Sequence, residues 1–241
     1  MNKERRYRSW KTKDGLIPFR VAVNETDLYI LAQTSLEREA REAVLRFRHT
    51  IEEYIKKEPL FKESMTPLPL DARAPEIVSE MLRASQRAKV GPMAGVAGAI
   101  AEFVGKTLLA YSPEVVVENG GDIFLHIDNE LTAGIFAGRS PLSNTVGIRI
   151  PAEKTPLGIC TSSGTVGHSQ SFGKADAVCV ISRSATLADA VATSLGNMVQ
   201  DKSDIETTLQ RGRRISGVEG IVIIVDDTLG VWGYYELAYL S

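Results

Sequence analysis

The sequence has few cysteines, no excess of either charge and no long hydrophobic run. Its two cysteines, Cys160 and Cys179, are too few for a disulfide framework and lack the paired spacing of a zinc site. This usage is typical of a reduced cytosolic setting, so we expect a cytoplasmic protein. With 28 basic and 30 acidic residues the net charge is −2, which predicts no general attraction to nucleic acid or to an anionic membrane.

Membrane-spanning and exported classes are also disfavoured. The longest uncharged run, residues 155–173, is long enough to cross a bilayer but consists largely of serine, threonine and glycine. No apolar stretch of the secretory kind follows the basic N-terminus. A phosphate-loop lysine, a dinucleotide fingerprint, a nucleophile elbow and an HExxH pair are all missing from the sequence. We therefore expect a soluble protein that belongs to none of these common catalytic classes.

No internal repeat and no low-complexity linker interrupts the chain, which predicts a single domain over residues 1–241. Residues 1–33 favour strands, residues 34–111 are mainly helical, and residues 112–241 are rich in strands with one strong helix. This order favours an α+β fold, with helices packed on a mixed or antiparallel sheet, over a doubly wound α/β sheet. We expect strands over 18–23, 28–32, 115–117, 123–127, 146–150, 177–181, 221–225 and 231–240, and helices over 36–55, 75–88, 91–104, 187–198 and 204–211.

Two of these helices have unusual features. Thr34 and Glu37 have the spacing of a capping box that would begin the long helix. The helix over 91–104 has Gly95 and Gly98 in its interior, each of which costs about 1 kcal/mol relative to alanine. Close packing against a sheet would compensate for these glycines, and so would a ligand that approaches the backbone and the helix N-terminus.

A Glu-Asn-Gly-Gly-Asp segment, residues 118–122, lies between two predicted strands. Gly120 and Gly121 allow positive φ and a close backbone approach, so exposed N–H groups there could meet a phosphate or a planar ring. Asp122 could bind a metal, a ribose or a ring nitrogen. A β-hairpin with an Asn-Gly turn at Asn119 is the structural alternative.

Residues 160–173 contain serine, threonine or glycine at nine of fourteen positions. Such a stretch suits a hydrogen-bonding loop around an oxygen-rich ligand, and it also suits a plain surface loop. His168 is its only group that titrates near neutral pH, which makes it a candidate general acid or base.

Asp189 and Thr193 are four residues apart in the predicted helix over 187–198, so their side chains share one face. A carboxylate and a hydroxyl one turn apart supply two hard oxygen ligands for Mg²⁺. A buried Asp189 would be costly without a partner. The alternative is a carboxylate near the start of the helix, stabilised by the helix dipole.

The order of these motifs along the chain resembles that of the ApbE-like superfamily. The order is a small-residue helix, then Asn-Gly-Gly-Asp, then Thr-Ser-Ser-Gly, then a histidine, and finally Ala-Asp-Ala-Val-Ala-Thr. Its best-known members are Mg²⁺-dependent FAD:protein FMN transferases. The likeness runs over residues 90–198 and is greatest to a short branch of that superfamily with no assigned function. The resemblance implies an ApbE-like fold with Mg²⁺ and FAD as cofactors.

The resemblance also implies roles for individual residues. Mg²⁺ would be held by Asp189 and Thr193, with a backbone carbonyl near residue 90 or 91. The catalytic residues would be His168 and Ser163. The flavin cofactor would be bound by the glycine turn and by the serine-rich segment, at Asn119, Gly120, Gly121, Asp122, Thr161, Ser162 and Gly164.

Three functions remain open from the sequence. The first is Mg²⁺-dependent binding of FAD with FMN transfer to an acceptor protein or cleavage of the FAD pyrophosphate. The second is a non-catalytic flavin- or nucleotide-binding protein, favoured because Ser169, Gln170 and Ser171 stand where the transferases have a hydrophobic pair and Asp-Pro. The third is a serine hydrolase that uses His168. A small-molecule dinucleotide is the expected partner, and the oligomeric state is left open.

Overall fold

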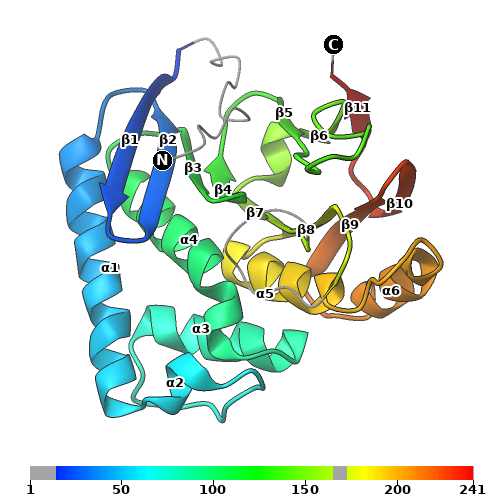
Figure 1. Ribbon diagram of the computed structural model, residues 1–241. Helices are drawn as coiled ribbons and strands as arrows, with labels where there is room; N and C mark the ends of the chain where they lie inside the picture. Colours follow the sequence, from blue (N-terminus) through cyan, green and yellow to red (C-terminus); the bar gives the residue numbers. More distant parts are fainter. Residues whose placement is uncertain (1–14, 165–172, 241) are drawn as a thin grey trace.

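The computed structural model describes residues 15–164 and 173–240, and it has three layers (Figure 1). Helices cover one face of a large antiparallel sheet, and a small sheet covers part of the other face. Alternate residues of the central strands enter the two cores: Val178 and Val180 face the helices, whereas Cys179 and Ile181 face the small sheet. A strand buried on both faces needs the continuous hydrophobic run that the sequence has at 177–181.

The large sheet has eight strands in the order β1-β2-β3-β4-β7-β8-β9-β10, and each neighbouring pair is antiparallel. Short hairpins join several neighbours, as antiparallel pairing permits. The strands are β1 Ile17–Val23, β2 Thr26–Ala32, β3 Val115–Asn119, β4 Asp122–His126, β7 Leu157–Ser162, β8 Ala177–Ser182, β9 Val218–Val225 and β10 Thr228–Gly233.

The small sheet has the order β11-β6-β5 and is also antiparallel. Its side chains form the second core with the outer face of the large sheet, where Ile148 and Ile150 of β6 are fully buried. The strands are β5 Leu131–Gly134, β6 Val146–Ile150 and β11 Leu237–Tyr239.

The helices lie together on the opposite face: α4 and α5 contact the central strands, α1 packs against α4 and β1, and α3 packs outside α5 (Figure 1). Within residues 15–164 and 173–240, no helix is long and apolar enough to cross a membrane. The helices are α1 Glu37–Lys57, α2 Leu60–Glu63, α3 Glu76–Ala88, α4 Val96–Leu108, α5 Ala185–Gly196 and α6 Asp204–Gly212, with 3-10 turns η2 Pro92–Gly95 and η3 Ala152–Lys154.

The α+β prediction is confirmed, but two strands were missed and three local expectations are wrong. β5 and β7 were not predicted, and the run expected at 231–240 is divided between β10 and β11 in different sheets. The helix expected from residue 91 begins as the 3-10 turn η2 and becomes an α-helix only at Val96. The Thr34–Glu37 capping box is absent, because α1 has Leu36 at its N-cap position and no side-chain cap.

Candidate functional site

The glycines of the small-residue helix allow α4 to cross α5 closely. A Cβ atom added to Gly98 would lie 2.3 Å from the carbonyl oxygen of Ala185, and one added to Gly95 would lie 2.9 Å from that of Thr186. On the sheet side, a Cβ at Gly105 would lie 2.2 Å from the ring of Phe124. Close packing therefore explains these three glycines.

Asp189 lies at this crossing, buried against the first turn of α4. Its Oδ2 accepts a hydrogen bond from the backbone N–H of Gly98 at 2.8 Å. Burial raises the pKa of Asp189 to about 7, although backbone hydrogen bonds from Gly98 and Ala97 act in the opposite direction. The helix whose N-terminus meets this carboxylate is thus α4, whereas the sequence argument considered only the dipole of Asp189's own helix.

Glu102 of α4 has the reciprocal position at the N-terminus of α5, which the sequence analysis missed. Its Oε2 accepts hydrogen bonds from Ser184 Oγ at 2.9 Å and from the N–H and Oγ1 of Thr186, both at 3.0 Å. Its Oε1 accepts one from Lys106 Nζ at 2.7 Å. Each helix therefore places a buried carboxylate at the other's N-terminus. The sequence contains one signal for this buried carboxylate, because Glu102 is the one charged residue in the otherwise apolar segment 96–105.

The Gly-Gly segment forms a β-hairpin between β3 and β4. Asn119 pairs with Asp122, so the two turn residues are Gly120 and Gly121 rather than the Asn-Gly pair considered from sequence. Their φ angles of 70° and 110° favour glycine at both positions. The N–H of Gly121 donates to Glu118 Oε1 at 2.8 Å.

This hairpin contacts the first turn of α4, which also contacts Asp189. The Asn119 side chain donates from Nδ2 to the carbonyl oxygen of Ala97 at 3.0 Å. Asp122 is buried, and its pKa is raised well above the usual range by burial and, next, by the charge of Asp189. The structure therefore brings Asn119, Asp122 and Asp189 together, although they come from two distant parts of the chain.

Cys160 is the cross-strand neighbour of Asp122 and is buried beside it. Its Sγ donates to the carbonyl oxygen of Ala185 at 3.3 Å. Burial, followed by the charges of Asp122 and Asp189, raises the pKa of this thiol well above its usual value. A neutral buried thiol is a poor nucleophile, so we assign Cys160 to packing.

The serine-rich segment begins on a strand rather than in a loop. Thr161 and Ser162 are the last residues of β7, and Ser163 and Gly164 follow directly. The Gly164 N–H donates to the carbonyl oxygen of Ala175 at 2.9 Å, and a Cβ at Gly164 would lie 2.0 Å from the Gly173 oxygen. The two ends of the segment therefore lie in contact. His168 falls outside the described residues, so its role stays a prediction.

The ends of the serine-rich segment reach the C-terminal end of α5. A Cβ added to Gly173 would lie 1.8 Å from the Gly196 oxygen, and one added to Gly196 would lie 3.2 Å from Ser162 Oγ. Thr193 precedes Gly196 by less than one turn and is half-buried on the face that carries Asp189. The predicted spacing of Asp189 and Thr193 on one helix is thus present.

The described residues contain no cluster of three or more histidine, cysteine, aspartate or glutamate side chains placed to hold a metal ion. The available donors are the Asp122 and Asp189 carboxylates, the Thr193 hydroxyl and backbone carbonyls, an all-oxygen set of the kind that Mg²⁺ prefers. The carbonyl ligand expected near residue 90 or 91 stays a prediction. The Val90 oxygen accepts a hydrogen bond from Ser85 Oγ at 2.6 Å, and Asp189 accepts hydrogen bonds from the backbone of residues 97 and 98.

A groove of about 740 Å³ opens beside the hairpin. Its lining is largely apolar and includes Ile51, Val96 and Ile100, and Ala97 and Asn119 also line it. Charged side chains from α1 and the segment after it border the groove, together with the β1–β2 turn: Glu25, Arg48, Glu52, Lys56 and Lys62. An elongated ligand with a planar apolar part and a polar part fits this distribution of surfaces.

The sequence profile of the family described as AbpE bacteria matches residues 8–230. The chain belongs to this family. It is 42% identical over 199 residues to a UPF0280 protein of Methanococcus aeolicus, covering 80% of each chain. It is 40% identical over 220 residues to a UPF0280 protein of Methanocaldococcus jannaschii, covering 89% of each.

Solved structures share the fold of this family member at low sequence identity. The ApbE protein from Thermotoga maritima has a TM-score of 0.58 and 14% identity, over 89% of this chain and 96% of that one. A variant of the flavin transferase ApbE from Vibrio cholerae has a TM-score of 0.56 and 12% identity, over 90% and 96%. The ApbE-like resemblance and the single-domain α+β fold are therefore confirmed.

Proposed function

We propose that this chain binds FAD together with Mg²⁺ and transfers FMN from it to an acceptor, either a protein hydroxyl or water. One observation carries the proposal: Asp122 and Asp189 are two buried carboxylates, close enough that one raises the pKa of the other. Neither forms an ion pair with lysine or arginine among the described residues. Buried like charges without a cation are costly, and a divalent cation removes that cost.

The donor set fits Mg²⁺. Asp189 accepts hydrogen bonds from the backbone of Gly98 and Ala97, and its two carboxylate oxygens have further lone pairs for a ligand bond. Thr193 is half-buried one turn further along α5, and no described residue forms a hydrogen bond with its hydroxyl. Carboxylate, hydroxyl and water oxygens are the usual ligands of Mg²⁺. When bound, Mg²⁺ would supply stabilisation of the negative charge that develops on the pyrophosphate oxygens.

The neighbouring surfaces suit the two halves of a flavin dinucleotide. We place the apolar ring system in the groove that Ala97 and Asn119 help to line. The Gly120–Gly121 turn connects Asn119, which lines this groove, with Asp122, and its backbone can approach a ligand because neither glycine has a side chain. Thr161 and Ser162 end β7, the strand that pairs with β4 at Asp122, and Gly164 follows them; the hydroxyl groups there suit phosphate oxygens.

In the proposed reaction the acceptor oxygen forms a bond with the phosphorus of the FMN half, and the P–O bond to AMP breaks. His168 takes the proton of the attacking hydroxyl, and Ser163 orients the phosphate from the end of β7. Asn119 holds the first turn of α4 through its hydrogen bond to the Ala97 carbonyl, and that first turn positions Asp189. Because His168 must be unprotonated to act as the base, activity should rise as the pH passes the pKa of a histidine.

A second candidate is a flavin-binding protein without transfer chemistry. It is favoured by the sequence itself, because Ser169, Gln170 and Ser171 stand where the transferases that the chain resembles have a hydrophobic pair and Asp-Pro. A serine hydrolase receives less support, because Ser162 ends a β-strand rather than occupying a strand-to-helix elbow.

The test is incubation of the purified chain with FAD, with Mg²⁺ or EDTA, followed by chromatography for AMP and FMN. The proposal expects flavin binding that needs Mg²⁺, measured by fluorescence, and AMP release that also needs it. Binding without AMP release would support the second candidate. Absence of any FAD binding at millimolar Mg²⁺ would overturn the flavin assignment.

Two variants sharpen the result. Asp189→Asn keeps the size and the acceptor for Gly98 but removes the charge, so Mg²⁺-dependent binding should fall by at least ten-fold. His168→Ala should leave FAD affinity within two-fold and lower AMP release. Equal AMP release by wild type and His168→Ala would remove the histidine from the mechanism.

A further inference from the structure

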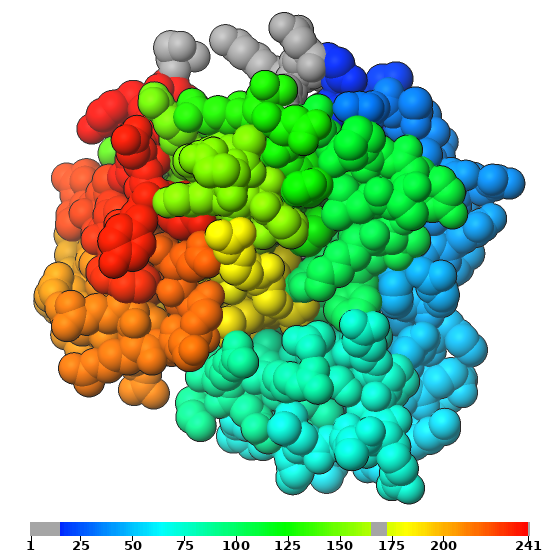
Figure 2. Space-filling model, turned by 180° about the vertical axis from the view of Figure 1, so that it is seen from behind, coloured from blue at the N-terminus to red at the C-terminus, as the bar shows by residue number. Residues whose placement is uncertain are grey.

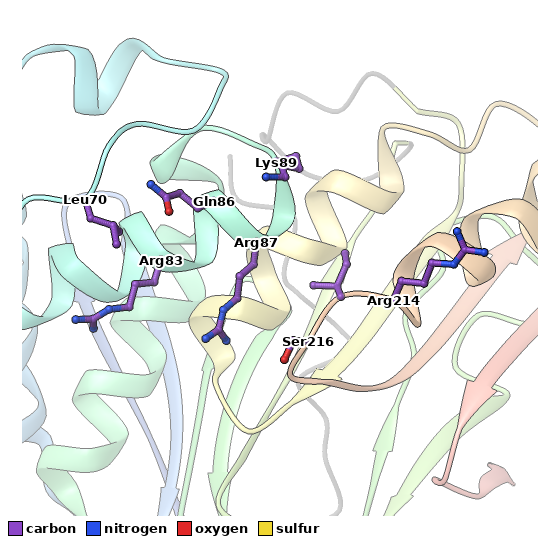
Figure 3. A pocket seen from close by; sticks show the side chains of 8 residues that line it. Leu70, Arg83, Gln86, Arg87, Lys89, Arg214 and Ser216 are labelled. Carbon is purple, nitrogen blue, oxygen red and sulfur yellow. The ribbon is translucent and has the colours of Figure 1, made fainter.

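A basic hollow of about 620 Å³ lies on the outer side of α3, apart from the residues assigned to flavin (Figure 3). One wall is the C-terminal half of α3, and the other is the loop that follows α6. Figure 2 shows these two segments, in teal and orange, meeting at the surface. The lining residues are Leu70, Arg83, Gln86, Arg87, Lys89, Arg214, Ile215 and Ser216.

The charge of this hollow is unbalanced. Arg83 pairs with Glu80 on its own helix. Arg87, Lys89 and Arg214 form no ion pair with any described residue. Three uncompensated cations in one concavity are unusual in a chain of net charge −2, and they create a local positive field.

Lys89 stands where the backbone favours glycine. It is the C-cap of α3, with φ 61° and ψ 39°, and its N–H donates to the carbonyl oxygen of Ser85. Glycine or asparagine is usual in this left-handed conformation, because a Cβ makes it less favourable. A cation near a helix C-terminus is stabilising, but Arg87 in the last turn already supplies one. The lysine is therefore better explained by what its charge binds.

The opposite wall supplies uncharged donors and apolar surface. Arg87 extends from α3 toward the loop that carries Ser216, and a Cβ at Gly217 would lie 3.5 Å from Arg87 Nη1 (Figure 3). Gly217 has a φ of 92°, a backbone conformation that favours glycine. Leu70 and Ile215 add apolar surface beside the cations.

We propose that this hollow binds a small ligand with two or more linked phosphate groups, held by Arg87, Lys89 and the Ser216 hydroxyl, with Arg214 adding positive charge at the edge of the hollow. Guanidinium groups match phosphate oxygens in two-bond geometry, and an ammonium adds a compact charge. The size of the hollow lies within the range of small-ligand sites. A small ligand is favoured over a nucleic acid, because a long polyanion would extend onto a chain that is acidic outside this hollow.

The test is calorimetric titration of the full chain with tripolyphosphate in EDTA, where no Mg²⁺ can attach the phosphates to Asp189. We expect a dissociation constant below 1 mM at low salt that weakens at least five-fold at ten-fold higher salt. Lys89→Gly combined with Arg87→Gln should weaken binding at least ten-fold. The Lys89→Gly single variant should bind tripolyphosphate more weakly than wild type. It should unfold at a temperature no lower than wild type, which would show that the weaker binding does not come from a loss of fold.

Controls distinguish this site from the proposed flavin site. Arg213→Gln removes a neighbouring charge that does not line the hollow and should change affinity less than two-fold. Asp189→Asn should bind tripolyphosphate as wild type does, and Lys89→Gly should keep Mg²⁺-dependent FAD binding. AMP that binds as tightly as ATP, an acidic peptide that binds as tightly as tripolyphosphate, or unchanged binding by the double variant would each overturn the proposal.

Discussion

Replacing Asp189 by asparagine measures what the buried charge at the α4–α5 crossing costs the unliganded protein. The pKa of Asp189 is raised from 3.8 to about 7, chiefly by burial. This difference corresponds to an upper limit of about 4 kcal/mol, at about 1.36 kcal/mol for each pKa unit. Because local relaxation and water reduce such penalties, we expect asparagine to stabilise the metal-free protein by about 1–3 kcal/mol at pH 8.

The sign follows from the direction of the shift. A carboxyl whose pKa is higher in the folded state binds more protons when folded, so wild-type stability falls as the pH rises from about 4 to about 7. Asparagine has no such titration, and it keeps an oxygen that can accept from the Gly98 N–H. The advantage of the variant should therefore be large at pH 8 and below about 1 kcal/mol at pH 4.5.

Urea unfolding followed by circular dichroism, in EDTA at both pH values, measures this difference. The control is Asp201→Asn, since hydrogen bonds from Ser203 lower the pKa of that exposed carboxyl and its contribution has the opposite sign. If Asp189→Asn is less stable than wild type at pH 8, the charge stabilises α4 more than burial penalises it. The cation requirement inferred from burial would then have no basis.

Three further predictions concern the same region. Mg²⁺ should raise the unfolding temperature more at pH 8 than at pH 5.5, because binding must displace a proton held by the Asp122–Asp189 pair; an equal rise at both pH values would argue against that ligand set. Gly98→Ala should cost about 1–3 kcal/mol in urea unfolding and Gly95→Ala less, because their Cβ atoms would lie 2.3 Å and 2.9 Å from backbone oxygens of α5. Glu102→Gln should cost about 2–3 kcal/mol, since three donors at the start of α5 lose a charged acceptor. Lys106→Met, which removes only the exposed partner, should cost less than about 1 kcal/mol, and similar losses in both variants would contradict the capping role of Glu102.

Local patterns in the sequence predicted most of the elements. The three- and four-residue spacing from Leu36 to Ile55 describes the inner face of α1, where Val44 and Ile51 are buried. The apolar runs at 177–181 and 221–225 became the central strands β8 and β9. β7 was missed because Gly158 lies within it and because it runs directly into the serine- and glycine-rich segment, which is typical of a loop. Gly158 occurs there for a tertiary reason, since a Cβ would lie 2.3 Å from Ala185.

In the candidate site, too, some features could be predicted from the sequence and others depended on the tertiary structure. Helical periodicity alone placed Asp189 and Thr193 on one face, and paired glycines alone predicted a tight turn. Which helix N-terminus would meet Asp189, and which carboxylate would lie beside it, depended on the crossing of α4 and α5 and on the pairing of β4 with β7. Periodicity acts over a few residues, whereas the burial that raises a pKa comes from segments far apart along the chain. The sequence by itself therefore determined the elements and the kinds of polar groups they carry, and only the tertiary structure decided which of those groups became a pair of buried charges.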